Sequence, residues 1–242
     1  MEKRIQIIVA LLACGISISA EAAVLVTNPG GLSNPINTLN VSISEEVGNM
    51  SLATMNGPHG PNIIRQTLTL DTTDGYPTTA GGAAPLNTAN NNSVVTPRRT
   101  ITFQNTGSSF FHLASGGNHQ SSGDQALIAE GAAHITTVSF DEPVLFVGFT
   151  ANRVFEELTV RVFSDAGQIG GDFTIAPNGA SGHSFFGYQS SAENIMYFEV
   201  QKVSGGNQYG LDDITFGVVI PEPSTALLLL VGAFVLRAIR LR

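Results

Sequence analysis

The chain has 242 residues, of which only 12% are charged, and its formal net charge at neutral pH is −8. This length fits one domain or at most two small ones. Between residues 23 and 220 there are six basic and sixteen acidic side chains, a formal charge of −10. The excess of acidic groups argues against nucleic acid as a partner, because binding through counterion release needs clustered lysine and arginine.

The first 22 residues have the layout of a secretory signal peptide. A basic start precedes the apolar stretch Ile5–Ile18, and small residues follow at Ala20 and Ala22. This order predicts export, with cleavage after Ala22 or Ala23.

The only cysteine, Cys14, lies inside this predicted signal peptide. The surrounding Leu-Leu-Ala-Cys-Gly leaves a lipoprotein cleavage at Cys14 open as an alternative. With the cut after Ala22, the mature protein has no cysteine, so burial and hydrogen bonding alone must stabilise it.

The carboxy-terminal segment, residues 220–242, contains a short apolar run. The stretch Ala226–Leu236 has eleven apolar or small residues. As a helix it would span about 17 Å, well short of a hydrocarbon core of about 30 Å. Arginines follow it, and they favour the cytoplasmic side of a membrane. Both ends of the chain therefore predict that residues 23–219 lie on the outer side of the membrane.

The order of features in this segment resembles the PEP-CTERM sorting signal. A Pro-Glu-Pro motif comes first, then the leucine-rich run, then three arginines: Pro221, Glu222, Pro223, Arg237, Arg240 and Arg242. The two prolines disfavour helix and predict an extended, accessible tripeptide.

The resemblance implies recognition by an exosortase, a membrane-embedded processing enzyme. It also implies a Gram-negative-type bacterium that makes extracellular polysaccharide. The expected destination is the cell surface or the extracellular matrix, with transient tethering to the inner membrane through the short carboxy-terminal helix.

The sequence predicts one all-β domain over residues 23–219. Short apolar runs alternate with polar residues and end at Gly, Asn, Asp or Pro. We expect ten to twelve strands and no helix, with exposed loops over 71–93 and 114–124. Ile135–Phe140 and Val144–Phe149 are predicted as two strands joined by a turn at residues 141–143. Leu158, Val160 and Val162 share one side of another strand. This pattern predicts an antiparallel β-sandwich.

The later part of this domain resembles the jelly-roll-like modules found upstream of such sorting signals. The residues that carry the resemblance are Phe140, Pro143-Val144, Gly148-Phe149, Phe185-Phe186-Gly187 and Leu211-Asp212-Asp213-Ile214. The resemblance implies an adhesive or matrix-associated module with no established activity.

No catalytic motif is present. The chain has five histidines, and no two of them are close enough in sequence to form a zinc site on one helix. We therefore expect a non-enzymatic protein. A secreted hydrolase whose residues assemble only in the fold remains an alternative.

Asp212 and Asp213 are the candidate metal ligands. Adjacent carboxylates at the mouth of the last strand would point to opposite sides if extended, so that one of them could ligate structural Ca²⁺. The other interpretation is a pair of turn residues that cap loop amides.

Carbohydrate binding would require exposed aromatic rings. The chain has no tryptophan and only four tyrosines. Tyr76 and Tyr209 are the candidate platforms, with core packing as the alternative for each. The leading prediction is a structural or adhesive surface protein associated with extracellular polysaccharide. A calcium-dependent carbohydrate-binding module is the second hypothesis.

Overall fold

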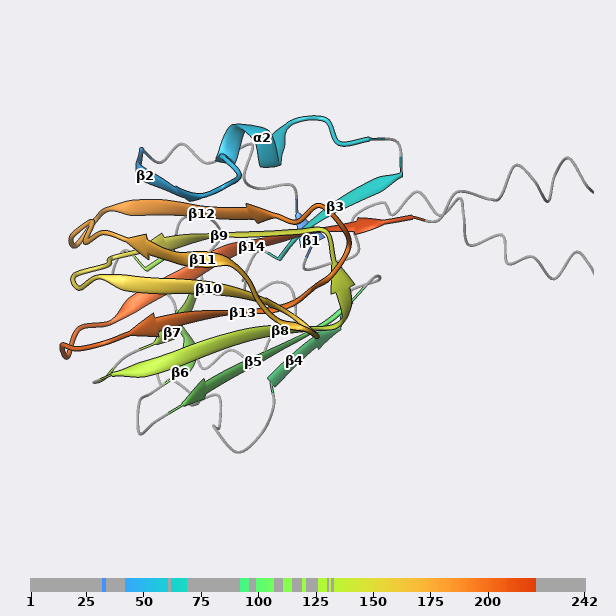
Figure 1. The fold of residues 1–242 in the computed structure, drawn as a ribbon. Coiled ribbons are helices and arrows are strands. Elements are labelled where there is room, and N and C mark those ends of the chain that lie inside the picture. The colour runs from blue at the N-terminus through green and yellow to red at the C-terminus, as the bar shows by residue number, and fades with distance from the viewer. Residues whose placement is uncertain are drawn as a thin grey trace, which may run out of the picture. The chain divides into compact units, whose positions relative to one another are not determined.

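The computed structural model describes residues 32–33, 42–60, 62–68, 92–95, 99–106, 111–114, 119–120, 126–129, 131 and 133–220. Apart from Ile220, these residues belong to one compact unit, Asn28–Val219. The unit is built from two packed β-sheets (Figure 1), which confirms the predicted β-sandwich.

The predicted export and sorting signals lie outside the described residues. These are the cleavage residues Ala20 and Ala22, the alternative site Cys14, and the carboxy-terminal residues Pro221, Glu222, Pro223, Arg237, Arg240 and Arg242. Within the described part of the chain, no helix has the length and apolar character needed to cross a bilayer.

The first sheet has eight strands. Its main order is β1 (Leu32–Ser33), β3 (Ile63–Leu68), β14 (Tyr209–Val219), β9 (Phe146–Asn152), β12 (His183–Gln189) and β2 (Ile43–Gly48). Two further strands extend from β14, namely β7 (Ala126–Ala129), which pairs with it, and β6 (Phe111–Ala114), which pairs with β7.

The second sheet has six strands. Its order is β11 (Gly167–Ile175), β10 (Leu158–Ser164), β13 (Ile195–Lys202), β8 (His134–Val144), β5 (Thr100–Thr106) and β4 (Asn92–Val95). All of its pairs are antiparallel, as predicted.

One strand pair departs from the antiparallel prediction. In the eight-stranded sheet, β2 runs parallel to β12. These strands are about 140 residues apart in sequence, since His183 aligns with Ile43. No hairpin joins them, so no short turn fixes their relative direction.

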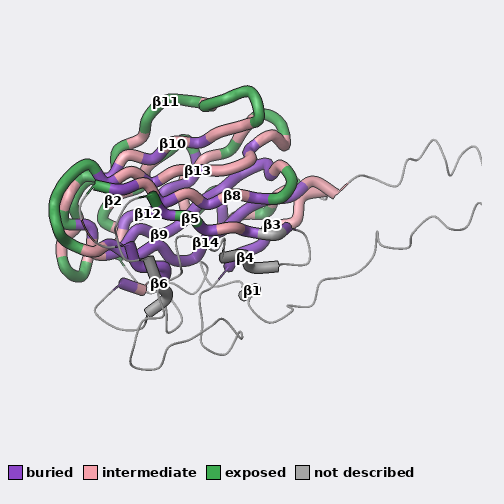
Figure 2. Tube along the Cα trace, turned by 90° about the horizontal axis from the view of Figure 1, so that it is seen from below, coloured by how far each residue is buried: buried purple, intermediate pink, exposed green. Residues whose placement is uncertain are grey.

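The core lies between the two sheets and follows from the alternation of side chains. Leu158, Val160 and Val162 are all buried, as predicted, while the residues between them are partly exposed (Figure 2). Phe149 of β9 stacks on Phe198 of β13 with ring centroids 5.1 Å apart, which joins the two sheets directly. Burying one such ring stabilises the fold by about 1.5–3 kcal/mol.

The turn predicted at residues 141–143 is wrong. β8 continues through these residues to Val144, and they form a bulge, because the register with β13 shifts between Ser139 and Val144. Proline has no amide hydrogen to give to a ladder, so Pro143 is tolerated where the ladder is already broken. The chain changes sheets only at Leu145, whose amide donates to the Gly217 carbonyl at 2.7 Å.

A short helix, α2 (Leu52–Asn56), was not predicted from the sequence. Ser51 caps it by accepting a hydrogen bond from the Thr54 amide at 3.1 Å. The helix buries Met55 against Gly148 of β9, where an added Cβ would lie 2.6 Å from the methionine sulfur. Only the capping residue marked this helix, because five residues are too few to show a helical period.

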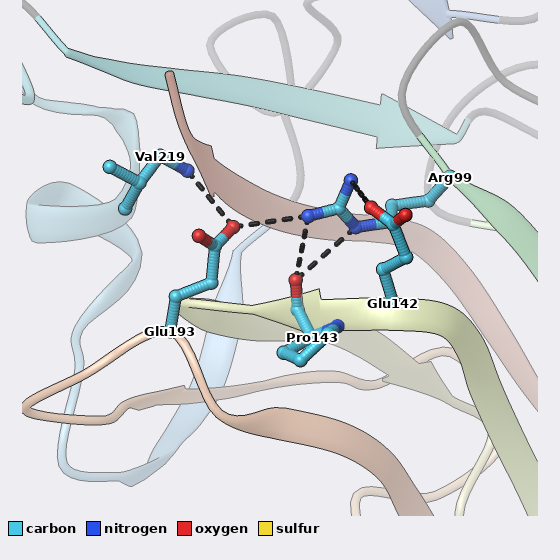
Figure 3. Close-up of polar contacts among 5 residues, drawn as sticks. All are labelled: Arg99, Glu142, Pro143, Glu193 and Val219. Carbon is cyan, nitrogen blue, oxygen red and sulfur yellow. Dashed lines mark hydrogen bonds and ion pairs between the residues drawn. The ribbon is translucent and has the colours of Figure 1, made fainter. Parts of the chain in front are cut away.

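Arg99 connects the bulge in β8 to the end of β14 (Figure 3). Its guanidinium donates to the Pro143 carbonyl at 2.8 Å and to Glu193 at 3.1 Å. Glu193 also accepts the Val219 amide at 3.0 Å. The side chain of Glu193, in the loop between β12 and β13, therefore fixes the last residue of β14 to the sandwich.

We expect Glu193→Ala to lower the free energy of unfolding by about 1–3 kcal/mol, because Arg99 and the Val219 amide both lose a partner. Urea denaturation measures the change. Glu142→Ala is the matched control: Glu142 contacts the same guanidinium at 3.1 Å, but its side chain is 70% exposed. This control should cost less than about 1 kcal/mol. Equal losses in the two variants would contradict the role given to Glu193.

Candidate functional site

Asp212 and Asp213 lie inside β14 and are fully buried, not at the mouth of the strand. Between Asp212 and Thr215, β14 has one residue more than the segment of β9 that pairs with it. This extra residue makes a β-bulge in β14. Asp213 has a φ of 50°, the left-handed region that Asp tolerates better than most residues. At the same point the other edge of β14 changes partner from β7 to β3.

The bulge corrects the expectation that the two carboxylates point to opposite sides. Leu211 and Ile214 both belong to the core between the sheets. Two residues lie between them, so simple alternation does not hold across Asp212-Asp213. Asp212 Oδ1 accepts the Asp213 amide at 2.8 Å, a contact within the bulge of β14 and not with a loop amide.

Hydroxyl groups surround this bulge. Thr150 is the strand partner of Asp212, and its buried Oγ1 has no hydrogen-bond partner among the described residues. Thr215 donates to the Asp213 carbonyl at 3.1 Å and shares a hydrogen bond of 2.8 Å with Thr67. Carboxylate, hydroxyl and carbonyl oxygens are the ligands that Ca²⁺ prefers.

The described residues contain no group of three or more His, Cys, Asp or Glu side chains that could hold a metal ion. A calcium ion at the bulge would therefore depend on two carboxylates together with hydroxyl and carbonyl oxygens. The calcium hypothesis stays a prediction, and it would give the ion a structural role.

Two of the five histidines, His119 and His183, hydrogen-bond to Asn152 of β9. Asn152 donates from Nδ2 to the His119 carbonyl at 2.8 Å, so its Oδ1 must accept from His183 Nδ1 at 2.7 Å. Burial lowers the pKa of His183 below its usual value. These contacts attach the His119 segment to β9 and β12, which is a structural role.

Tyr209 is not a sugar platform. It is 2% exposed and stacks on His134 with ring centroids 5.5 Å apart. Its hydroxyl hydrogen-bonds to Thr136 at 2.9 Å, and burial raises its pKa. Core packing, the alternative given for this residue, is confirmed. The other candidate, Tyr76, lies outside the described residues.

The outer face of the six-stranded sheet is accessible in the described part of the chain. It consists of the positions that alternate with the core residues, and the described ones on β5, β8, β10 and β13 are partly or fully exposed (Figure 2). The central members of this outer face are Arg161 and Phe163 on β10, Tyr197, Glu199 and Gln201 on β13, Thr137 and Ser139 on β8, and Thr102 and Gln104 on β5.

Phe163 and Tyr197 form an aromatic pair at the centre of one row of this outer face. They are direct cross-strand partners, and their rings stack with centroids 4.5 Å apart and an interplanar angle of 7°. Beyond Tyr197, the same row continues with the small side chains Ser139 and Thr102. One face of the Tyr197 ring is covered by Phe163, so its other face is directed along this row.

Charged and amide groups occupy the next row. Arg161 binds Asp172 through two contacts of 3.1 Å and donates to Gln201 at 2.6 Å. Glu199 follows Tyr197 by two residues on the same face. Partial burial, and secondarily the negative charge of Glu199, raise the pKa of Tyr197.

The aromatic pair was missed because most phenylalanines were assigned to the core. The signal was present: with Val160 and Val162 facing inward, Phe163 must face outward. Which residue stands opposite Phe163 could not be read from the sequence, because it depends on the register between β10 and β13.

No protein-family model matches the chain, and no curated protein matches it. Among solved structures, a mutant of the family 29 carbohydrate-binding module CBM29-2 is similar, with a TM-score of 0.38 and 9% identity over 67% of this chain and 99% of that one. TmCBM61 in complex with β-1,4-galactotriose has a TM-score of 0.36 and 14% identity over 48% and 88% of the two chains.

A third similar structure is the enzymatically active domain of tailspike protein 4 from bacteriophage CBA120. Its TM-score is 0.37 and its identity 11%, over 50% of this chain and only 19% of the tailspike chain. These similarities name no family for the chain.

If Ca²⁺ binds at the bulge in β14, adding it at 1,000 times its Kd should raise the free energy of unfolding by about 4 kcal/mol. This corresponds to a rise in Tm of about 8–16 °C, and a chelator should reverse it. Asp213→Asn should abolish the response, since asparagine also tolerates positive φ and keeps the backbone conformation. The exposed Asp165→Asn is the control and should keep the response. A Tm that neither calcium nor chelator changes would rule out the site.

Proposed function

We propose that the chain is an exported, non-enzymatic β-sandwich that binds extracellular polysaccharide through the outer face of its six-stranded sheet. The observation that carries the proposal is the half-buried, stacked aromatic pair Phe163–Tyr197 on this outer face, with hydroxyl, amide and carboxylate groups in the adjoining positions. An aromatic ring offers an apolar face to the C–H side of a sugar, and the polar neighbours offer hydrogen bonds to its hydroxyl groups.

An open sheet face suits a polymer better than a small enclosed substrate. The row Phe163, Tyr197, Ser139 and Thr102 crosses four adjacent strands, which lie about 4.8 Å apart. An extended sugar chain can lie along such a row and contact several side chains at once. The jelly-roll-like relationship drawn from the sequence remains part of this proposal.

The calcium hypothesis concerns a different sheet. The bulge at Asp212 lies in β14 of the eight-stranded sheet, whereas the aromatic pair lies on the six-stranded sheet. A calcium ion there would stabilise the fold and would not touch a sugar on the proposed platform. At a temperature where the calcium-free protein is still folded, sugar binding should therefore not require calcium. Sugar binding that does require calcium under these conditions would contradict the proposed arrangement.

Sorting by an exosortase is the second part of the proposal. It is supported by the resemblance of residues 220–242 to the PEP-CTERM signal. It is also supported by the end of β14 at Val219, two residues before Pro221, with the Val219 amide bound by Glu193. A tail that follows a fixed strand end can reach a membrane enzyme without unfolding the sandwich.

We expect Tyr197→Ala to weaken polysaccharide binding about tenfold, a loss of about 1.4 kcal/mol, because the stacking surface disappears. Affinity electrophoresis of the purified protein in gels containing β-1,4-glucan, β-1,4-mannan or deacetylated chitin measures the change. Phe155→Ala is the matched control, since Phe155 is an accessible aromatic residue, 37% exposed, that lies outside the sheet. Unchanged binding in Tyr197→Ala, or an equal loss in the control, would contradict the proposed platform.

Processing of the tail is tested by mass spectrometry of the protein from the surface fraction of its native host. We expect the mature chain to end near Pro221-Glu222-Pro223. An intact Arg242 in that fraction would contradict processing by an exosortase and would leave the polysaccharide platform to be judged separately.

A further inference from the structure

Glu199 is a carboxylate on the outer face of the six-stranded sheet without a compensating charge. It is only partly buried, and it makes no hydrogen bond or ion pair with any described residue. Its cross-strand partners are Arg161 on one side and Thr137 on the other. Arg161 would be the natural counter-ion for Glu199.

Arg161 is bound elsewhere. Its Nε contacts both carboxylate oxygens of Asp172 at 3.1 Å, and its Nη1 donates to Gln201 Oε1 at 2.6 Å. The Arg161–Asp172 pair is neutral as a unit. The net charge contributed by Arg161, Asp172 and Glu199 together is therefore negative, and its source is Glu199.

This negative charge lies beside the aromatic platform. Glu199 and Tyr197 are two residues apart on one side of β13, about 6.6 Å along the strand. A sugar stacked on Tyr197 over the small Ser139 would have the Glu199 carboxylate on one flank.

We infer that the outer face of the six-stranded sheet selects polysaccharides that carry free amino groups, such as deacetylated amino-sugar polymers. This inference rests on the proposed function and names the class of sugar. A protonated amine on a ring stacked against Tyr197 lies within reach of the Glu199 carboxylate. Uronic acid polymers would meet both this carboxylate and the formal charge of −10 carried by residues 23–220, and they should be repelled.

The test compares two hexamers of the same β-1,4 linkage, glucosamine and N-acetylglucosamine, by isothermal titration at pH 6 and low salt. The wild-type protein should bind the free-amine hexamer more tightly. Glu199→Gln should weaken that binding three- to fivefold and leave the acetylated hexamer unaffected, as expected for a partly exposed charge pair. Raising the salt to about 1 M should remove most of the preference, because the Debye length falls to about 3 Å.

Glu46→Gln is the matched control, since it makes the same change in charge on an exposed residue of β2 in the other sheet. It should keep the preference for the free amine. Equal affinity of the wild type for both hexamers, or an equal effect of Glu199→Gln on both, would overturn the selectivity while the polysaccharide platform stands. Failure to bind either hexamer, or any polysaccharide of the gel series, would overturn the proposed function as well.

Discussion

The packing of two sheets through one shared core is the constraint on which the other features of this protein depend. With a single cysteine the chain can form no internal disulfide, so contacts such as the stack of Phe149 on Phe198 must hold the sheets together. Because Val162 and Phe198 face this core, Phe163 and Tyr197 must face outward. The outer face of the six-stranded sheet is therefore a direct consequence of the alternation that builds the core.

At two of the bulges among the described strands, the chain changes its path. The bulge at residues 140–143 in β8 precedes the passage from one sheet to the other, and Arg99 binds its Pro143 carbonyl. The bulge at Asp212-Asp213 lies where β14 changes its neighbour. Extra residues leave backbone groups without ladder partners, so polar side chains gather at both places.

Much of the fold could be predicted from the sequence, because burial imposes a two-residue period that is visible in Leu158, Val160 and Val162. The prediction was wrong where a residue type is common in two kinds of structure. Pro143 was assigned to a turn but occupies a bulge. Asp212-Asp213 were placed at a strand end but lie within a strand. The parallel pairing of β2 with β12, and the partners Phe163 and Tyr197, depend on contacts between distant segments that no local pattern encodes. The platform could therefore be found only once the register between strands was known.

The central claim is that this outward row of the six-stranded sheet is the surface that meets sugar. Amide chemical-shift mapping of the ¹⁵N-labelled protein during titration with the glucosamine hexamer tests it most directly. The account predicts shifts clustered around Tyr197 and Ser139 on β13 and β8, with little change on the eight-stranded sheet. Shifts clustered around Asp212 and β14, or none at saturating sugar, would contradict it.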